Sequence, residues 1–158
     1  MSERARNLAQ QFEQENHELI ATVERLSDAQ WRTKTAGEGW SLGVVAHHVA
    51  EGHKQIAGLA QLVASGQPIP AMNMEMFHQA NAEHARQHAD CTKAETLALL
   101  RQNGAAAAAT VRGLSDAELD RTGSLLMGPM STAQVIERIL IGHVHEHHGS
   151  IRKAGVRL

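Results

Sequence analysis

Apolar residues recur every three or four positions along most of this sequence, which is the spacing of one face of an α-helix. No convincing stretch alternates apolar with polar residues, as a half-buried β-strand does. The 158 residues include two Phe, two Trp and no Tyr. A core must therefore be built from Leu, Ile, Val, Ala and Met, which suits packed helices better than strands. The sequence predicts an all-α fold.

Four long helices in a single domain over residues 1–158 account for this periodicity. Capping residues indicate where helices begin and end, such as Ser41 before the second helix and Gly66 after it. In the third region, a break at residues 90–92 leaves open whether there is one kinked helix or two. The expected helices cover Glu3–Leu26, the segment from Ser41 to Gly66, the segment from Met72 to about Arg112, and the segment that follows the N-cap Ser131.

Two similar segments predict short extra helices in the long connections. Leu26-Ser27-Asp28-Ala29-Gln30 and Leu114-Ser115-Asp116-Ala117-Glu118 each place a Ser three residues before Gln or Glu, which is the pattern of a capping box. Both connections are long enough to cross an end of a helical bundle. Simple hairpin topology between successive long helices is therefore not required.

Charge and composition exclude several classes of protein. The chain has 15 Lys and Arg against 17 Asp and Glu, so it lacks the basic surface expected for nucleic-acid or acidic-lipid partners. There is no run of about 18 apolar residues to span a membrane, and residues 1–10 lack the apolar block of a secretory signal. Cys91 is the single cysteine, which excludes an internal disulfide. We expect a cytoplasmic protein that acts on a small molecule.

Histidine is the residue type that most strongly suggests chemistry, because the chain contains 11 of them. Two pairs are spaced four residues apart, His84/His88 and His143/His147. At this frequency chance alone gives about 0.8 such pairs, so the spacing by itself carries little weight.

The direction in which each imidazole points is more informative than the spacing. On a helical wheel at 100° per residue, His143 and His147 lie within the apolar stripe of the last long helix, and His48 lies within that of the second. The wheel places three of their neighbours toward solvent or away from the stripe, namely His47, His145 and His148.

Three imidazoles directed into an apolar interior each need a polar partner, because an unpaired buried polar group costs about 1–3 kcal/mol. One shared metal ion would serve all three. Three His ligands on one face of an ion leave coordination positions free for water or substrate, which is typical of catalytic sites. Three separately hydrogen-bonded core histidines would explain the same pattern.

Two segments around the inward-facing histidines match motifs of a known family. Trp40-Ser41, followed after six residues by His48 and Val49, is similar to the motif that opens the second helix of the DinB/YfiT-like metalloenzymes. The segment His143 to Ile151 is similar to their C-terminal His-x3-His-x-Gly-Gln motif, although Ser150 stands where Gln is usual. The resemblance extends over nearly the whole chain, including the segments around Asn81, Thr92–Leu97 and Leu114–Asp116.

The resemblance implies a four-helix bundle, often a homodimer, in which His48, His143 and His147 hold a divalent metal ion such as Zn, Ni or Fe. Some relatives use a low-molecular-weight thiol for S-transfer or isomerisation. We therefore expect a metal-dependent enzyme with an open three-histidine site, either a thiol-dependent S-transferase or a hydrolase. Its metal would lower the pKa of a water or thiol. The alternatives are a non-catalytic, stress-related bundle that binds a metal or ligand, and a purely structural bundle.

Other polar residues have both a functional and a structural interpretation. His84 and His88 could form a second metal site or extend the first one, or they could line a polar groove. Asn16 could orient an imidazole or a water, or hydrogen-bond to a neighbouring helix in the core. Glu51 could be a general base or a solvated carboxylate, and Cys91 a nucleophile, a ligand or a buried packing residue.

Overall fold

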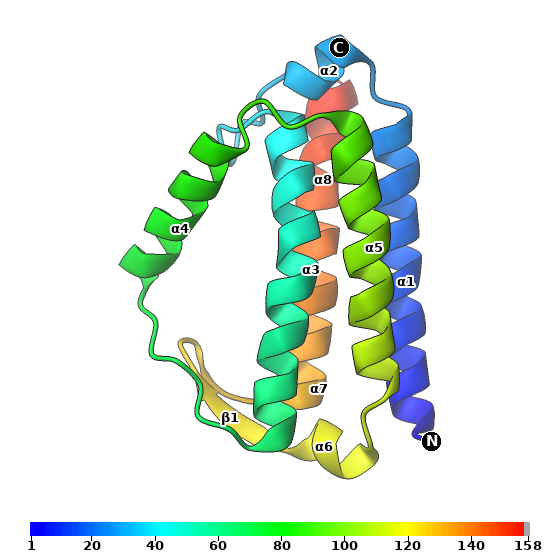
Figure 1. The fold of residues 1–158 in the computed structure, drawn as a ribbon, viewed down its shortest axis with the longest axis vertical. Coiled ribbons are helices and arrows are strands. Elements are labelled where there is room, and N and C mark those ends of the chain that lie inside the picture. The colour runs from blue at the N-terminus through cyan, green and yellow to red at the C-terminus, as the bar shows by residue number, and fades with distance from the viewer. Residues whose placement is uncertain (157–158) are drawn as a thin grey trace.

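The structure is a computed structural model, and it describes residues 1–156. Four long helices form a bundle (Figure 1), in which α1 and α3 lie diagonally and each contacts both of the other two. The four helices are α1 (Glu3–Glu24), α3 (Leu42–Ser65), α5 (Lys93–Arg112) and α8 (Gly142–Val156). The prediction of an all-α four-helix bundle is confirmed.

Most helix ends lie where the local capping residues predict them. The Ser41 side chain accepts a hydrogen bond from the Val44 amide at the start of α3, and Gly66 ends that helix with a φ of 71°. The third predicted region is two helices, α4 (Met74–Gln87) and α5, separated by a capping box at Thr92. Capping boxes also begin the short helices α2 (Asp28–Arg32) and α6 (Asp116–Asp120).

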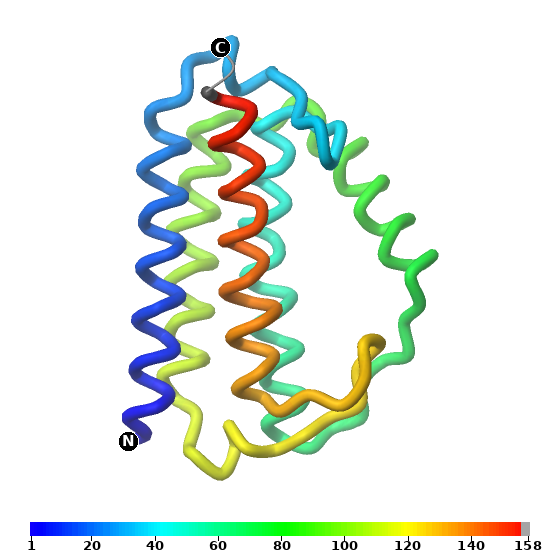
Figure 2. The backbone as a smooth tube through the Cα atoms, turned by 180° about the vertical axis from the view of Figure 1, so that it is seen from behind, coloured from blue at the N-terminus to red at the C-terminus, as the bar shows by residue number. Residues whose placement is uncertain are grey.

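The helices α1 and α8 run in one direction and α3 and α5 in the other (Figures 1 and 2). This arrangement is possible because α4 returns the chain from the end of α3 to the start of α5. It does so outside the bundle, on the side of α3. The four helices therefore do not follow a simple up-and-down order.

The outlying position of α4 is reflected in its burial. The structure describes all of this helix, and none of its side chains is buried. Met74, Met76 and Phe77 are 57%, 45% and 40% exposed. The helix is therefore held by few apolar contacts.

Two features of the last third of the chain differ from the prediction. A hairpin of β1 (Thr122–Leu125) and β2 (Gly128–Ser131) precedes the last long helix. Its strands are four residues each, too short for an alternating pattern to stand out. The predicted last helix begins as α7 (Thr132–Gln134) and continues through a π-helix, η1 (Val135–Ile141), into α8.

Aliphatic residues and one aromatic residue fill the centre of the bundle. Fully buried side chains come from each long helix and from η1, and they include Phe12, Leu19, Val45, Val49, Leu100, Ile136, Leu140 and Ile151. Within residues 1–156, no helix combines the length and the apolar character that a membrane crossing requires. Of the three predicted site histidines, His48 lies in the first third of α3, and His143 and His147 lie in the first half of α8.

Candidate metal centre

His48 of α3 and His143 and His147 of α8 meet at one place, which we call the inner cluster. Each offers a nitrogen within 4.8 Å of those of the other two. The Nε2 atoms of His48 and His143 are 2.9 Å apart. The spacing of four residues places His143 and His147 on the same side of α8, and the contact between α3 and α8 brings His48 to them.

Burial keeps two of these imidazoles neutral. It lowers the pKa of His48 to about 4, with help from the nearby His147 and His84. Burial lowers the pKa of His143 further, and the neighbouring His147 and His48 act in the same direction. Because a neutral imidazole carries one free lone pair, both rings can bind a metal at neutral pH.

A carboxylate fixes the orientation of the third imidazole. Glu38 Oε1 lies 3.0 Å from His147 Nδ1, and both side chains are only 14% exposed. Burial opposes the charge on Glu38, but nearby donors, first the Thr35 side chain and the Glu38 backbone amide, lower its pKa on balance. The Nδ1–H of His147 therefore donates to a carboxylate, and its Nε2 remains available, as in many carboxylate–histidine–metal arrangements.

Glu38 was not among the predicted site residues. It lies in the turn between Gly37 and Gly39, outside any helix. A residue in an irregular loop has no periodicity from which its direction could be inferred. Its position two residues before the motif that begins at Trp40-Ser41 was the single local clue.

A close approach between α3 and α8 places His143. A Cβ atom added to Gly52 would lie 2.6 Å from Cε1 of His143. The absence of a side chain at Gly52 therefore makes room for this ring one turn of helix after His48. Within the described residues, the Nδ1 atom of His143 is buried without a hydrogen-bond partner.

The donor set of the inner cluster fits a divalent metal ion of borderline softness. Nitrogens lie about 2.0–2.1 Å from such an ion, so two ligands on adjacent positions are about 3 Å apart. The 2.9 Å separation of the His48 and His143 nitrogens matches this value. Three imidazoles suit Zn, Ni, Fe or Co.

Two histidines are buried although the helical wheel placed His148 toward solvent and His47 away from the apolar stripe, so that part of the prediction is wrong. His47 is 4% exposed because α4 lies over that side of α3, and its Nδ1 is 2.8 Å from Nε2 of His84. His148 is 4% exposed because α8 also packs against α1, where its Nε2 is 2.7 Å from Thr22 Oγ1. His145 is exposed, as predicted.

The three rings of His47, His84 and His88 form a second group, which we call the outer cluster. Each offers a nitrogen within 4.8 Å of those of the other two. The His84 ring lies 5.7 Å from that of His48, measured between centroids. The outer cluster therefore adjoins the inner one.

Asn16 is part of the core packing and not of the inner cluster. Its Nδ2 donates to the Leu100 carbonyl at 3.0 Å, and its Oδ1 is 2.8 Å from His53 Nε2. Because Oδ1 can only accept, the Nε2 of His53 carries the proton. The sequence left open whether Asn16 is a core residue or a site residue, and its partner His53, which is 1% exposed, was not among the predicted residues.

The two remaining candidates lie outside the inner cluster. Glu51 is close enough to His47 for its charge to oppose the effect of burial on the pKa of that ring. Cys91 packs against the core, and burial raises the pKa of its thiol. A thiol with a raised pKa is a poor nucleophile at neutral pH.

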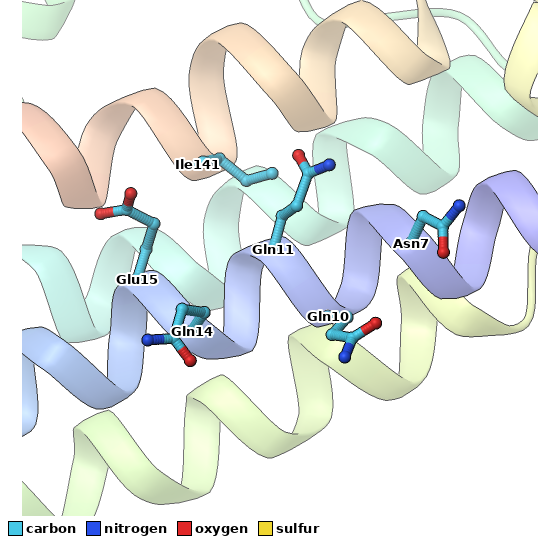
Figure 3. Close-up of a pocket in the computed structure, with 6 residues that line it drawn as sticks. All are labelled: Asn7, Gln10, Gln11, Gln14, Glu15 and Ile141. Carbon is cyan, nitrogen blue, oxygen red and sulfur yellow. The ribbon is translucent and has the colours of Figure 1, made fainter.

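A groove along α1 is separate from both clusters (Figure 3). Its lining is mostly polar and includes no histidine: Asn7, Gln10, Gln11, Gln14, Glu15 and Ile141. It therefore contributes nothing to the chemistry described above.

Comparisons with known proteins agree with this architecture. Residues 12–148 match the family model of the mycothiol maleylpyruvate isomerase N-terminal domain. YfiT from Bacillus subtilis, described as a probable metal-dependent hydrolase with an unusual four-helix bundle topology, is 20% identical with a TM-score of 0.79, over 99% of this chain and 89% of that chain. The comparison with curated proteins found no match.

A second solved structure, a histidine-to-alanine mutant of the mycothiol-dependent maleylpyruvate isomerase, is 13% identical with a TM-score of 0.75. The match covers 96% of this chain and 63% of the isomerase chain, so this chain spans less than two thirds of that enzyme. At these identities the two structures show the fold alone. Because the family model covers most of the sequence, this chain belongs to the family of the mycothiol maleylpyruvate isomerase N-terminal domain, within the DinB/YfiT-like group that its motifs resemble.

Proposed function

We propose that this protein is a divalent-metal-dependent enzyme in which His48, His143 and His147 hold one metal ion. The observation that carries the proposal is the convergence of these three nitrogens from two helices, with His147 oriented by Glu38. Three protein ligands leave at least one coordination position open, which is the arrangement of catalytic sites and not of closed structural ones. A bound ion would supply a Lewis acid that lowers the pKa of a water or thiol toward neutrality.

The surrounding residues prepare the site in ways that do not depend on the substrate. Glu38 holds the His147 ring so that one nitrogen faces the cluster. The indole of Trp40 lies edge-on to His48, with ring centroids 5.3 Å apart, and so provides an apolar contact on that side of the imidazole. The low pKa values of His48 and His143 keep protons from competing with a cation at neutral pH.

Two reaction classes suit this site, namely thiol-dependent S-transfer and the hydrolysis of a small molecule. The family is named after a mycothiol-dependent isomerase, and YfiT is described as a probable hydrolase. Both therefore support a small-molecule substrate, and the first favours a thiol cosubstrate. The homodimer and the cytoplasmic location stay predictions.

A substrate panel on metal-loaded and metal-depleted protein tests the proposal. Thiols are paired with epoxides and chloronitroaromatics for S-transfer, and simple esters and amides are offered for hydrolysis. We expect turnover that requires the metal, and its dependence on the thiol separates the two classes. If protein with a full complement of metal converts none of these substrates, the alternative of a non-catalytic binding protein is favoured.

Gly52→Ala is expected to weaken metal binding without removing any ligand. The added methyl group would lie 2.6 Å from a ring atom of His143, so that ring must move. Because ligand geometry must hold to within about 0.5 Å, we expect the affinity to fall by about 10–100-fold. Competition with a chromogenic chelator measures the change.

The matched control for this prediction is Gly58→Ala on the same helix. A Cβ at Gly58 meets no atom within 4 Å. The alanine there should leave metal affinity unchanged and slightly stabilise the helix. Equal metal affinities of Gly52→Ala and Gly58→Ala would show that metal binding does not require His143 to be in its observed position.

A further inference from the structure

The outer cluster joins two helices that otherwise touch little. His47 projects from α3, while His84 lies in the last turn of α4 and His88 is the C-cap residue of that helix. The Nδ1 of His47 is 2.8 Å from Nε2 of His84, and the His47 and His88 rings are stacked with centroids 4.0 Å apart. Three rings from two separate parts of the chain therefore share one small volume.

Hydrogen bonds among these rings leave one nitrogen unsatisfied. A neutral imidazole has one donor and one acceptor. The contact between His47 and His84 uses one nitrogen of each, and the Nδ1 of His84 is buried with no hydrogen-bond partner among the described residues. An unpartnered buried polar atom has lost its hydrogen bonds to water without replacement, which carries a cost in folding free energy. A ligand that accepts lone pairs from all three rings would offset this cost.

The surroundings favour a cation. The carboxylates of Glu51 and Glu95 lie close enough for their charges to act on His47. His84 and His88 are half-buried, so an ion can reach them from solvent. The nitrogens lie within 4.8 Å of one another, and binding one ion would require the stacked His47 and His88 rings to rotate until the ligand nitrogens are about 3 Å apart.

We propose that His47, His84 and His88 form a second site for a divalent metal ion such as Zn, Ni or Co, separate from the inner cluster. Its role is to fasten α4 to α3. The structure describes every side chain of α4, and none of them is buried. Apolar packing therefore contributes little to holding α4 against α3. Three metal–nitrogen bonds between the two helices would supply what packing does not.

Metal stoichiometry tests the proposal. Metal-free protein is loaded with Zn²⁺, desalted and analysed for zinc. We expect two equivalents in the wild type, one in His84→Ala, one in His147→Ala and none in the double variant. His78→Ala is the matched control, because His78 is an exposed histidine on the same helix. This variant should retain both ions.

The outcomes separate the two sites. If His84→Ala keeps as much zinc as the wild type, the second site is wrong, whatever the inner cluster does. If His147→Ala keeps the wild-type content while His84→Ala loses one equivalent, the second site stands and the inner ligand assignment fails. His88→Ala repeats the test with an independent side chain.

Hydrogen exchange gives a readout of the fastening role. Zinc should slow amide exchange in residues 74–87 of the wild type and of His147→Ala. It should have no such effect in His84→Ala, although that variant still binds zinc at the inner cluster. Equal protection of α4 in His84→Ala and the wild type would overturn the proposed role.

Discussion

Replacing His147 by Ala is expected to remove one equivalent of bound divalent metal and to leave the helical content of the protein unchanged. The side chain is a ligand in the proposed inner site, and Glu38 fixes its orientation. Losing even an outer hydrogen-bond partner of a ligand typically costs 10–100-fold in affinity, so losing the ligand itself should cost more than about 100-fold. Helicity is retained because the ring lies beside the apolar core and is not part of it.

Elemental analysis and circular dichroism measure the two parts of this prediction. His145→Ala is the control, because His145 lies on the same helix with its side chain 70% exposed. That variant should keep the wild-type metal content and activity. A His147→Ala protein with undiminished metal would show that the ligands have been assigned wrongly.

The metal-free protein is expected to lose stability as the pH falls from 7.5 to 5, and His53 accounts for about 2 kcal/mol of the loss. Burial lowers the pKa of His53 from 6.5 to about 4. Between these values the unfolded chain binds a proton that the folded chain does not, so stability is full above pH 6.5 and falls as the pH drops toward 4. A pH of 5 lies 1.5 units below the ordinary pKa of 6.5, which applies to the unfolded chain. Each of these units lowers the free energy of unfolding by about 1.36 kcal/mol.

Urea unfolding of the wild type and His53→Gln at both pH values, with a chelator present, tests this expectation. The variant should be less stable at pH 7.5, because a glutamine fills the site imperfectly. Its loss of stability between pH 7.5 and pH 5, however, should be smaller than that of the wild type by about 2 kcal/mol. His17→Gln on the exposed side of α1 should keep the wild-type pH dependence. Identical pH dependence in His53→Gln and the wild type would contradict the assignment.

The long helices and most of their ends were predictable because capping is local. The side chains of Ser41, Thr92 and Ser131 bond to amides three residues further along the chain, so the sequence around each residue suffices. The hairpin at residues 122–131 was not predictable in this way. Its short strands are positioned by contacts with distant residues, such as that between Gly123 and Ile69.

The inward direction of His48, His143 and His147 could be inferred because the apolar stripe of a helix marks the side that packs on the core. The same reasoning failed for His47 and His148. Each of these lies on a second covered side of its helix, against α4 or α1, and a wheel of one helix shows only the side with the most apolar residues.

The sequence by itself determined the helical class, the caps and the three histidines that face the interior, since each depends on residues a few positions apart. Only the tertiary structure decided that α4 crosses outside the bundle, that Glu38 meets His147 and that His47 meets His84. The Glu38 and His147 side chains are 109 positions apart, and those of His47 and His84 are 37 apart. Such pairs form when whole helices pack, because the packing sets distances that no local spacing encodes.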